Sequence, residues 1–134
     1  MILTDLVQFI NNYFFPTLGM YKIDYYQKGE IIIGGNSYHN DVIILPNKII
    51  SNWKRQSYTI LTINDLQLII PERPCFLIVG SGYSGSIPIP EDTQNRLRSL
   101  GFELFVGTNR NAMHKYNENF EKKKTIAIFL FTQS

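Results

Sequence analysis

The sequence predicts an α/β protein with three layers, in which helices cover both faces of a mixed central β-sheet that follows an N-terminal β-meander. Three observations predict this fold. The apolar run FLIV at residues 76–79, closed by Gly80, is typical of a strand buried on both faces. Two helix-then-strand units follow this run, and several short β-like runs precede it. Alternation of helix and strand after a central strand places helices on both sides of a sheet.

Composition indicates one ordinary globular domain, which we place at residues 21–134. The chain has 134 residues, 44% of them apolar and 18% charged, which is enough to bury a core. A net charge of +2 gives no basis for nucleic-acid binding, so we expect no nucleic-acid partner. The single cysteine, Cys75, has no intramolecular disulfide partner, and we expect it to be a small buried side chain. No apolar run approaches the roughly 18 residues of a membrane span, so we expect no transmembrane segment.

Residues 1–20 read as an amphipathic helical extension in front of the domain. Thr4 is placed to cap it, and apolar side chains recur at helical spacing, among them Leu6, Ile10, Tyr13 and Phe14. Such a face needs a surface to cover it, either on this domain or on another chain. No Lys or Arg precedes Lys22, so the segment does not resemble an Arg-rich mitochondrial presequence.

The meander is expected in residues 21–53. Short β-like runs lie at residues 21–26, 31–33, 42–45 and 49–53, with a turn at Gly34-Gly35-Asn36 between the second and third. The last run leads to Trp53, the only tryptophan, which is either a core plug or an exposed contact at the margin of the core.

A short helix is predicted at residues 61–70. Thr62 and Asp65 stand at capping-box spacing, and Leu66, Ile69 and Ile70 form its buried stripe before Pro71 ends it.

The loop after the central strand spells Gly80-x-Gly82-x-x-Gly85, the spacing of a dinucleotide-binding fingerprint. That fingerprint requires the third glycine to lie in the opening helix. Here Pro88 and Pro90 keep the preceding residues extended, so a helix begins at Pro90 rather than in the loop. We therefore expect the glycines to serve a tight exit from the strand.

The remaining elements carry clear end signals. A helix is predicted at residues 90–100, ended by Gly101, and a strand at residues 103–106. Thr108 then caps a helix that runs to about residue 119. The apolar run at residues 125–131 is expected to lie inside the sheet.

The residues themselves offer no reaction. His39 and His114 lie far apart without a Cys or His at ligand spacing, and both read as surface residues. No acidic pair stands out as a candidate acid and base. We expect no catalytic residue and no metal site.

The order of these pieces resembles a small α/β family that contains the human adipogenesis-associated protein and an assembly factor of mitochondrial respiratory complex I. The matching segments, listed in chain order, are Ile33-x-Gly35, VIILP at 42–46, Trp53, LTINDL at 61–66, FLIVGSG at 76–82, LGFELFVGT at 100–108 and NAMHKYN at 111–117. The resemblance covers roughly residues 26–132 and leaves the N-terminal extension outside. The chain departs from the family pattern at Ser81, where threonine is usual, and at Gly107, where an acidic residue is common.

The resemblance implies the three-layer fold, no cofactor and no demonstrated catalytic residue. It also directs attention to a candidate cleft at the strand ends, formed by Gly80, Ser81, Gly82, Gly85, Thr108, Asn109 and Arg110. A helix N-terminus beside a glycine loop is able to hold an anion, whereas the alternative is ordinary capping by Thr108.

The leading hypothesis is therefore a non-enzymatic interaction protein, an assembly factor or accessory component of mitochondrial complex I. Its partners are other protein subunits, which it is expected to contact through Leu6, Ile10, Tyr13, Phe14 and Trp53. One alternative is a small-molecule-binding or enzymatic protein that uses the Ser81/Thr108 cleft. Another is a cytosolic regulatory homologue, with a cytoplasmic rather than a mitochondrial location.

Overall fold

A computed structural model describes residues 19–131, which form a mixed α/β fold with two β-sheets and helices on both faces of the larger one. The predicted extension at residues 1–20 lies almost entirely outside the described residues. The predicted fold class is confirmed.

The larger sheet has five strands in the order β5-β4-β8-β6-β7. Its centre consists of β6 (Phe76–Gly80) and β8 (Thr125–Phe129), which are parallel to each other. The edge strand β7 (Glu103–Gly107) is parallel to β6, whereas β4 (Val42–Ile44) is antiparallel to β8. Every residue of β6 and β8 is buried, as continuous apolar runs predict for central strands.

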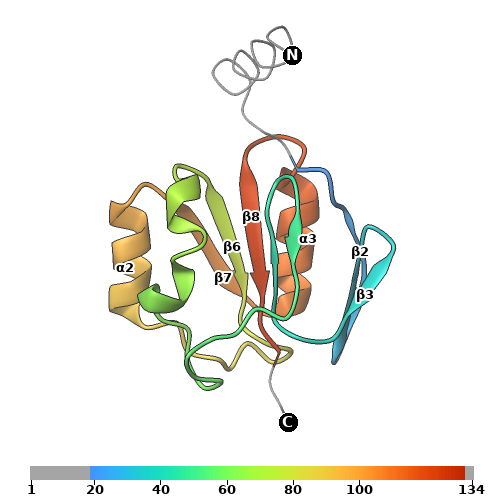
Figure 1. Ribbon diagram of the computed structural model, residues 1–134, viewed down its shortest axis with the longest axis horizontal. Coiled ribbons are helices and arrows are strands. Elements are labelled where there is room, and N and C mark those ends of the chain that lie inside the picture. The colour runs from blue at the N-terminus through green and yellow to red at the C-terminus, as the bar shows by residue number, and fades with distance from the viewer. Residues whose placement is uncertain (1–18, 132–134) are drawn as a thin grey trace, which may run out of the picture.

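A helical layer covers each face of this sheet (Figure 1). On one face, α2 (Glu91–Ser99) and two short 3-10 helices bury Leu97, Leu66 and Ile69 against Leu77 and Ile128. On the other face, α3 (Asn109–Asn119) packs Ala112, Met113 and Tyr116 against Ile78, Ala127 and Phe129. The three-layer prediction is thus confirmed, with α2 and α3 at nearly the predicted positions.

The N-terminal meander is divided between the two sheets. The strands β1 (Ile23–Gln27), β2 (Glu30–Ile33) and β3 (Asn36–Tyr38) form a separate antiparallel sheet that packs beside α3. The hairpin of β4 and β5 (Ile49–Ile50) joins the larger sheet instead. Burial explains the division: β4 is buried along its whole length, whereas β1 exposes three of its five residues.

Two predicted elements are wrong in detail. The turn at Gly34-Gly35-Asn36 is shorter than expected, because Asn36 already begins β3, a strand that the sequence analysis missed. The last strand of the meander ends at Ile50 rather than at Trp53. Asn52 has a φ of 56°, in the left-handed region, and this turn takes the chain out of the sheet.

The helix predicted at residues 61–70 is replaced by two 3-10 helices, η1 (Ile63–Leu66) and η2 (Ile70–Glu72). The predicted capping box of Thr62 and Asp65 is present. The apolar residues Ile63, Leu66 and Ile69 recur every three positions and face the same core, which matches the 3-residue turn of a 3-10 helix better than an α-helix.

Candidate functional site

The glycine loop after β6 folds back onto the strand that follows it in the sheet. Gly82 and Gly85 have φ values of 101° and 74°, which only glycine adopts readily. The amide of Ser81 donates to the carbonyl of Gly107 at 2.8 Å, and the Ser81 hydroxyl donates to the same carbonyl at 3.1 Å. The loop is therefore a tight exit from β6, as the sequence predicts.

Asn109, the first residue of α3, is the polar centre of this region and is completely buried. Its side-chain Oδ1 accepts from the amide of Gly82 at 3.1 Å. Its Nδ2 donates to the carbonyl of Leu130 at 2.9 Å and to the Tyr26 hydroxyl at 3.2 Å. One side chain thus joins the loop after β6, the end of β8 and strand β1.

The close approach of Asn109 explains why Gly80 ends the central strand. A Cβ atom at position 80 would lie 2.3 Å from Asn109 Oδ1 and 3.1 Å from the Asn109 backbone. No side chain fits there without moving the asparagine. Position 85 is less crowded, since a Cβ atom there would meet Thr108 Cγ2 at 3.2 Å.

Thr108 caps α3 as predicted, because its hydroxyl accepts from the amide of Asn111 at 3.2 Å. The amide of Asn109 donates to the Gly82 carbonyl, and the amide of Ala112 donates to the Thr108 carbonyl. Arg110 is exposed, and its guanidinium lies 5.8 Å from the ring centre of Tyr26, at the margin of this region.

The structure therefore brings the candidate cleft residues together, Arg110 excepted, and we call the set Gly80, Ser81, Gly82, Gly85, Thr108 and Asn109 the glycine-loop junction. The amides of Ser81, Gly82, Gly85 and Asn109 all donate within the chain. An anion would have to displace these hydrogen bonds, so this arrangement favours the capping interpretation over an anion site.

The Tyr26 hydroxyl beside the junction is held in its neutral form. Burial raises the pKa of Tyr26, and the hydrogen bond from Asn109 together with the nearby Arg110 charge opposes part of that shift.

The other titratable candidates behave as surface or core residues. His39 and His114 are both exposed, as expected. Burial raises the pKa of the Cys75 thiol to about 12, so the nucleophilic thiolate is not formed at neutral pH. Within residues 19–131 no cluster of three His, Cys, Asp or Glu side chains is arranged to hold a metal ion.

Of the predicted partner contacts, Leu6, Ile10, Tyr13 and Phe14 lie outside the described residues. Trp53 is half-buried, packs against the core on the α2 side of the sheet and also borders a hollow of about 510 Å³. Both alternatives for Trp53, core contact and marginal exposure, therefore hold in part.

A buried ion pair beside Trp53 escaped the sequence analysis. The Arg55 Nε donates to Asp41 Oδ2 at 2.6 Å, and both side chains are almost completely buried. Arg55 Nη1 also contacts the carbonyls of Ser57, Tyr58 and Ile60. The two partners are 14 residues apart in a polar stretch, and no local pattern links them.

None of the helices within residues 19–131 is long and apolar enough to cross a membrane.

Comparison with known proteins places the chain in a family. Residues 23–131 match the family described as "Protein of unknown function (DUF498/DUF598)". No curated protein matches the chain.

Several solved structures share the fold. A conserved hypothetical protein of Pyrococcus horikoshii aligns with a TM-score of 0.70 at 21% identity, covering 83% of this chain and 98% of that one. The Rpa2829 protein of Rhodopseudomonas palustris aligns with a TM-score of 0.67 at 23% identity, covering 89% and 87%. A Bordetella pertussis protein described as an Mth938-like domain aligns with a TM-score of 0.64 at 16% identity, covering 81% and 84%. At these identities the likeness concerns the fold, and together with the match over residues 23–131 it leads to one assignment: the chain belongs to the DUF498/DUF598 family.

Proposed function

We propose that this chain is a non-enzymatic interaction protein that serves as an assembly factor or accessory component of mitochondrial respiratory complex I. The sequence resemblance supports the link to complex I, which is an argument by analogy. One structural observation supports the non-enzymatic part. At the glycine-loop junction, where an open α/β sheet would hold a substrate, the amide donors and the Ser81 hydroxyl are already bonded to the chain's own carbonyls and to Asn109.

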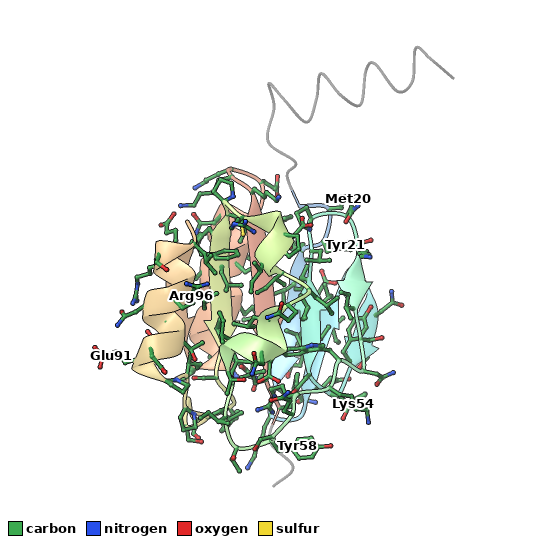
Figure 2. The ribbon with its side chains drawn as sticks, turned by 60° about the vertical axis from the view of Figure 1, so that its left-hand side comes forward. Met20, Tyr21, Lys54, Tyr58, Glu91 and Arg96 are labelled. Carbon is green, nitrogen blue, oxygen red and sulfur yellow. The ribbon has the colours of Figure 1, made fainter. Side chains whose placement is uncertain are left out.

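The surface supplies apolar side chains for contact with other subunits. Exposed large apolar side chains are Met20, Tyr25, Tyr58, Leu68 and Tyr83, with exposures between 50% and 71%. Tyrosine and methionine are enriched in protein interfaces, and tyrosine contacts a partner at low entropic cost. These side chains do not form one patch, since Met20 and Tyr58 lie at opposite ends of the molecule (Figure 2), and we propose that the N-terminal extension is the main docking element.

The test is affinity purification of the full chain, tagged at the C-terminus and expressed in its own cells. The proposal expects complex I subunits or a second assembly factor to accompany it, in amounts that survive a salt wash. Recovery of the chain without any complex I component would contradict the link to complex I. The interaction role itself would fail if no protein accompanied it reproducibly.

Location distinguishes the complex I proposal from the alternative of a cytosolic regulatory homologue. A mitochondrial protein should co-fractionate with inner-membrane complexes, through its partners, whereas the regulatory alternative predicts a cytoplasmic protein. Imaging of the tagged full chain against a mitochondrial marker separates these outcomes, and a purely cytoplasmic signal would favour the regulatory homologue.

A further inference from the structure

We propose that the hollow beside Trp53 is a binding site for a small planar ring that carries an anionic group. The hollow measures about 510 Å³, within the range of small-molecule sites. Its walls come from the loop between β3 and β4, from the segment after β5 and from Phe131, which follows β8. Figure 2 shows Lys54 and Tyr58 of this region at the same lower end of the molecule. The site is distinct from the glycine-loop junction and does not depend on the proposed role in assembly.

Three aromatic side chains line the hollow, namely Trp53, Tyr58 and Phe131. Trp53 and Phe131 are half-buried, and Tyr58 is 54% exposed. Aromatic side chains gathered around one hollow offer faces and edges on which a flat ring stacks, as bases do on aromatic side chains in nucleic-acid complexes. A planar ligand is therefore the shape that these walls accept best.

Several polar side chains around the hollow have no hydrogen-bond partner among residues 19–131, in contrast to the amides of the glycine-loop junction. The side chains of Asn40, Asn52 and Lys54 line the hollow, and none of them makes a hydrogen bond to another described residue. The Trp53 indole N–H and the Tyr58 hydroxyl are likewise unbonded within residues 19–131. The hollow therefore combines aromatic walls with polar side chains, the two kinds of group that orient a ligand in small-molecule sites.

The buried ion pair holds the walls in place. Arg55 Nη1 donates to the Tyr58 carbonyl at 3.1 Å and so fixes the backbone that carries that side chain. Asp41, which lines the hollow, accepts from Arg55 through Oδ2 and from the Phe131 amide through Oδ1 at 2.7 Å. A single ion pair therefore ties together three walls of the hollow. A site held in this way loses little conformational entropy when a ligand binds.

A further buried donor lies at this ion pair. Arg55 Nη2 is buried and has no hydrogen-bond acceptor among the described residues. It shares an edge of the planar guanidinium with Nε, which faces Asp41, but Asp41 Oδ1 is turned towards Phe131. Arg55 is not one of the residues that line the hollow, so a buried water molecule explains this donor better than the ligand does.

Charge at the hollow favours an anion. The Asp41 carboxylate is neutralised by Arg55, whereas Lys54 forms no ion pair with any described residue. His39 adds no negative charge, and its ring is held by the Gly29 carbonyl and the Ser37 hydroxyl. The ligand class is thus a stacked ring with a carboxylate or phosphate for Lys54, while the amides of Asn40 and Asn52 bond to ring substituents. Mononucleotides and aromatic carboxylates both have this chemistry.

Trp53 provides the measurement, because it is the only tryptophan in the chain and borders the hollow. The purified full chain would be titrated with adenosine 5′-monophosphate, adenosine and benzoate while Trp53 emission is recorded with excitation beyond the absorbance of the probes. We expect a saturable change with the monophosphate, with benzoate or with both, and at least about tenfold weaker binding of adenosine than of the monophosphate if the latter binds.

The pattern of binding distinguishes the two sources of this chemistry. Binding of the monophosphate alone assigns the site to mononucleotides, and binding of benzoate assigns it to aromatic carboxylates. If neither the monophosphate nor benzoate gives a saturable change in emission up to about 5 mM, the proposal is overturned. Equal affinity for adenosine and its monophosphate would overturn the anionic part.

Matched variants locate the site. Tyr58→Ala and Lys54→Gln remove a stacking face and the Lys54 ammonium group, and each is expected to weaken binding about tenfold. The control variants are Tyr25→Ala and Lys48→Gln, which remove equally exposed side chains away from the hollow and should leave the affinity unchanged. Unchanged binding in both site variants, or equal losses in the controls, would place the ligand elsewhere. Thermal melts of all four variants should match the parent, because every substituted side chain is exposed.

Discussion

At the scale of the residue, Asn109 shows how a polar side chain can organise an otherwise apolar core. Its side-chain amide makes hydrogen bonds to three buried groups, namely the Gly82 amide, the Leu130 carbonyl and the Tyr26 hydroxyl. Each of these groups would be buried without a partner if the amide were absent. A fully satisfied buried network of this kind specifies one arrangement of the elements that it joins.

Asn109→Ala is therefore expected to destabilise the fold by about 2–4 kcal/mol, because it leaves buried donors and acceptors without partners. Urea unfolding followed by circular dichroism measures the change. The control is Asn111→Ala, two residues along the same helix, where the side chain is exposed and the loss should stay under about 0.5 kcal/mol. A loss below about 1 kcal/mol for Asn109→Ala would mean that this network contributes little to stability.

Cys75 gives a prediction for alkaline pH. Burial raises its pKa from 9.0 to about 12, so the folded state keeps the proton that the unfolded state loses. Below pH 9 both states are protonated and stability is unaffected. As the pH rises from about 9 towards about 12 the unfolded state binds fewer protons, and the free energy of unfolding falls.

The melting temperature should consequently decline above pH 9, and Cys75→Ala should lessen the decline between pH 9 and pH 10. Burial also raises the pKa of Tyr116 above its ordinary value of 10.0, so this tyrosine adds to the loss at higher pH. Melts recorded in steps of pH test both statements. A decline of the same slope in the variant would assign the effect to groups other than Cys75.

At the scale of the element, we expect substitutions in strand β8 to reduce the stability of the larger sheet the most. It lies between β4 and β6, and Ile128 is completely buried in the core on the α2 side. Strand β5 is the opposite case, a two-residue edge strand with half-buried side chains. The same substitution in the two strands therefore measures the difference between a central and an edge position.

Ile128→Ala should cost on the order of 2–5 kcal/mol, from lost burial and from the cavity that remains. Ile49→Ala in β5 should cost less than half of that, because the site is open to solvent and leaves no enclosed cavity. Denaturant unfolding of both variants supplies the comparison. Equal losses at the two positions would contradict the central placement of β8.

At the scale of the whole molecule, the described residues form a hydrophobic core on each face of the larger sheet. The family match begins at residue 23, after the extension that carries Leu6 and Ile10. We therefore expect the apolar face of that extension to serve contact with a partner rather than the stability of the domain. An isolated helix of this length is marginal in water, so it requires a surface to pack on.

The double variant Leu6→Asp with Ile10→Asp should leave the melting temperature nearly unchanged and abolish co-purification with the partner. Two charges buried in an interface without counterparts cost several kcal/mol, which is enough to dissociate most complexes. Melting and affinity purification of the same variant separate the possibilities. A collapsed melt would assign the extension to the core of this domain, and intact co-purification would exclude it as the docking element.

Sequence alone was sufficient for the elements whose signals are local. The apolar runs of β6 and β8 identified the centre of the sheet. The prolines before residue 90 and Gly101 placed the two ends of α2 close to their observed bounds, and Thr108 did the same for the start of α3. The set of residues at the glycine-loop junction was also predicted, except that Arg110 lies over the Tyr26 ring at its margin. These signals lie within a few residues of the structure that they specify, so the chain reveals them without its fold.

Tertiary packing decided the rest. It divided the meander between two sheets, because among the meander strands β4 alone is buried along its whole length. It also replaced the helix predicted at residues 61–70 with 3-10 turns that present Ile63, Leu66 and Ile69 to one core. It also gave Asn109 its partners and joined Asp41 to Arg55, an ion pair that holds the walls of the hollow beside Trp53. The partners of Asn109 lie 21–83 residues away in sequence, and no local pattern encodes contacts at such separations. Burial and long-range hydrogen bonds exist only once the strands are assembled, and for this reason the hollow emerged from the structure and not from the sequence.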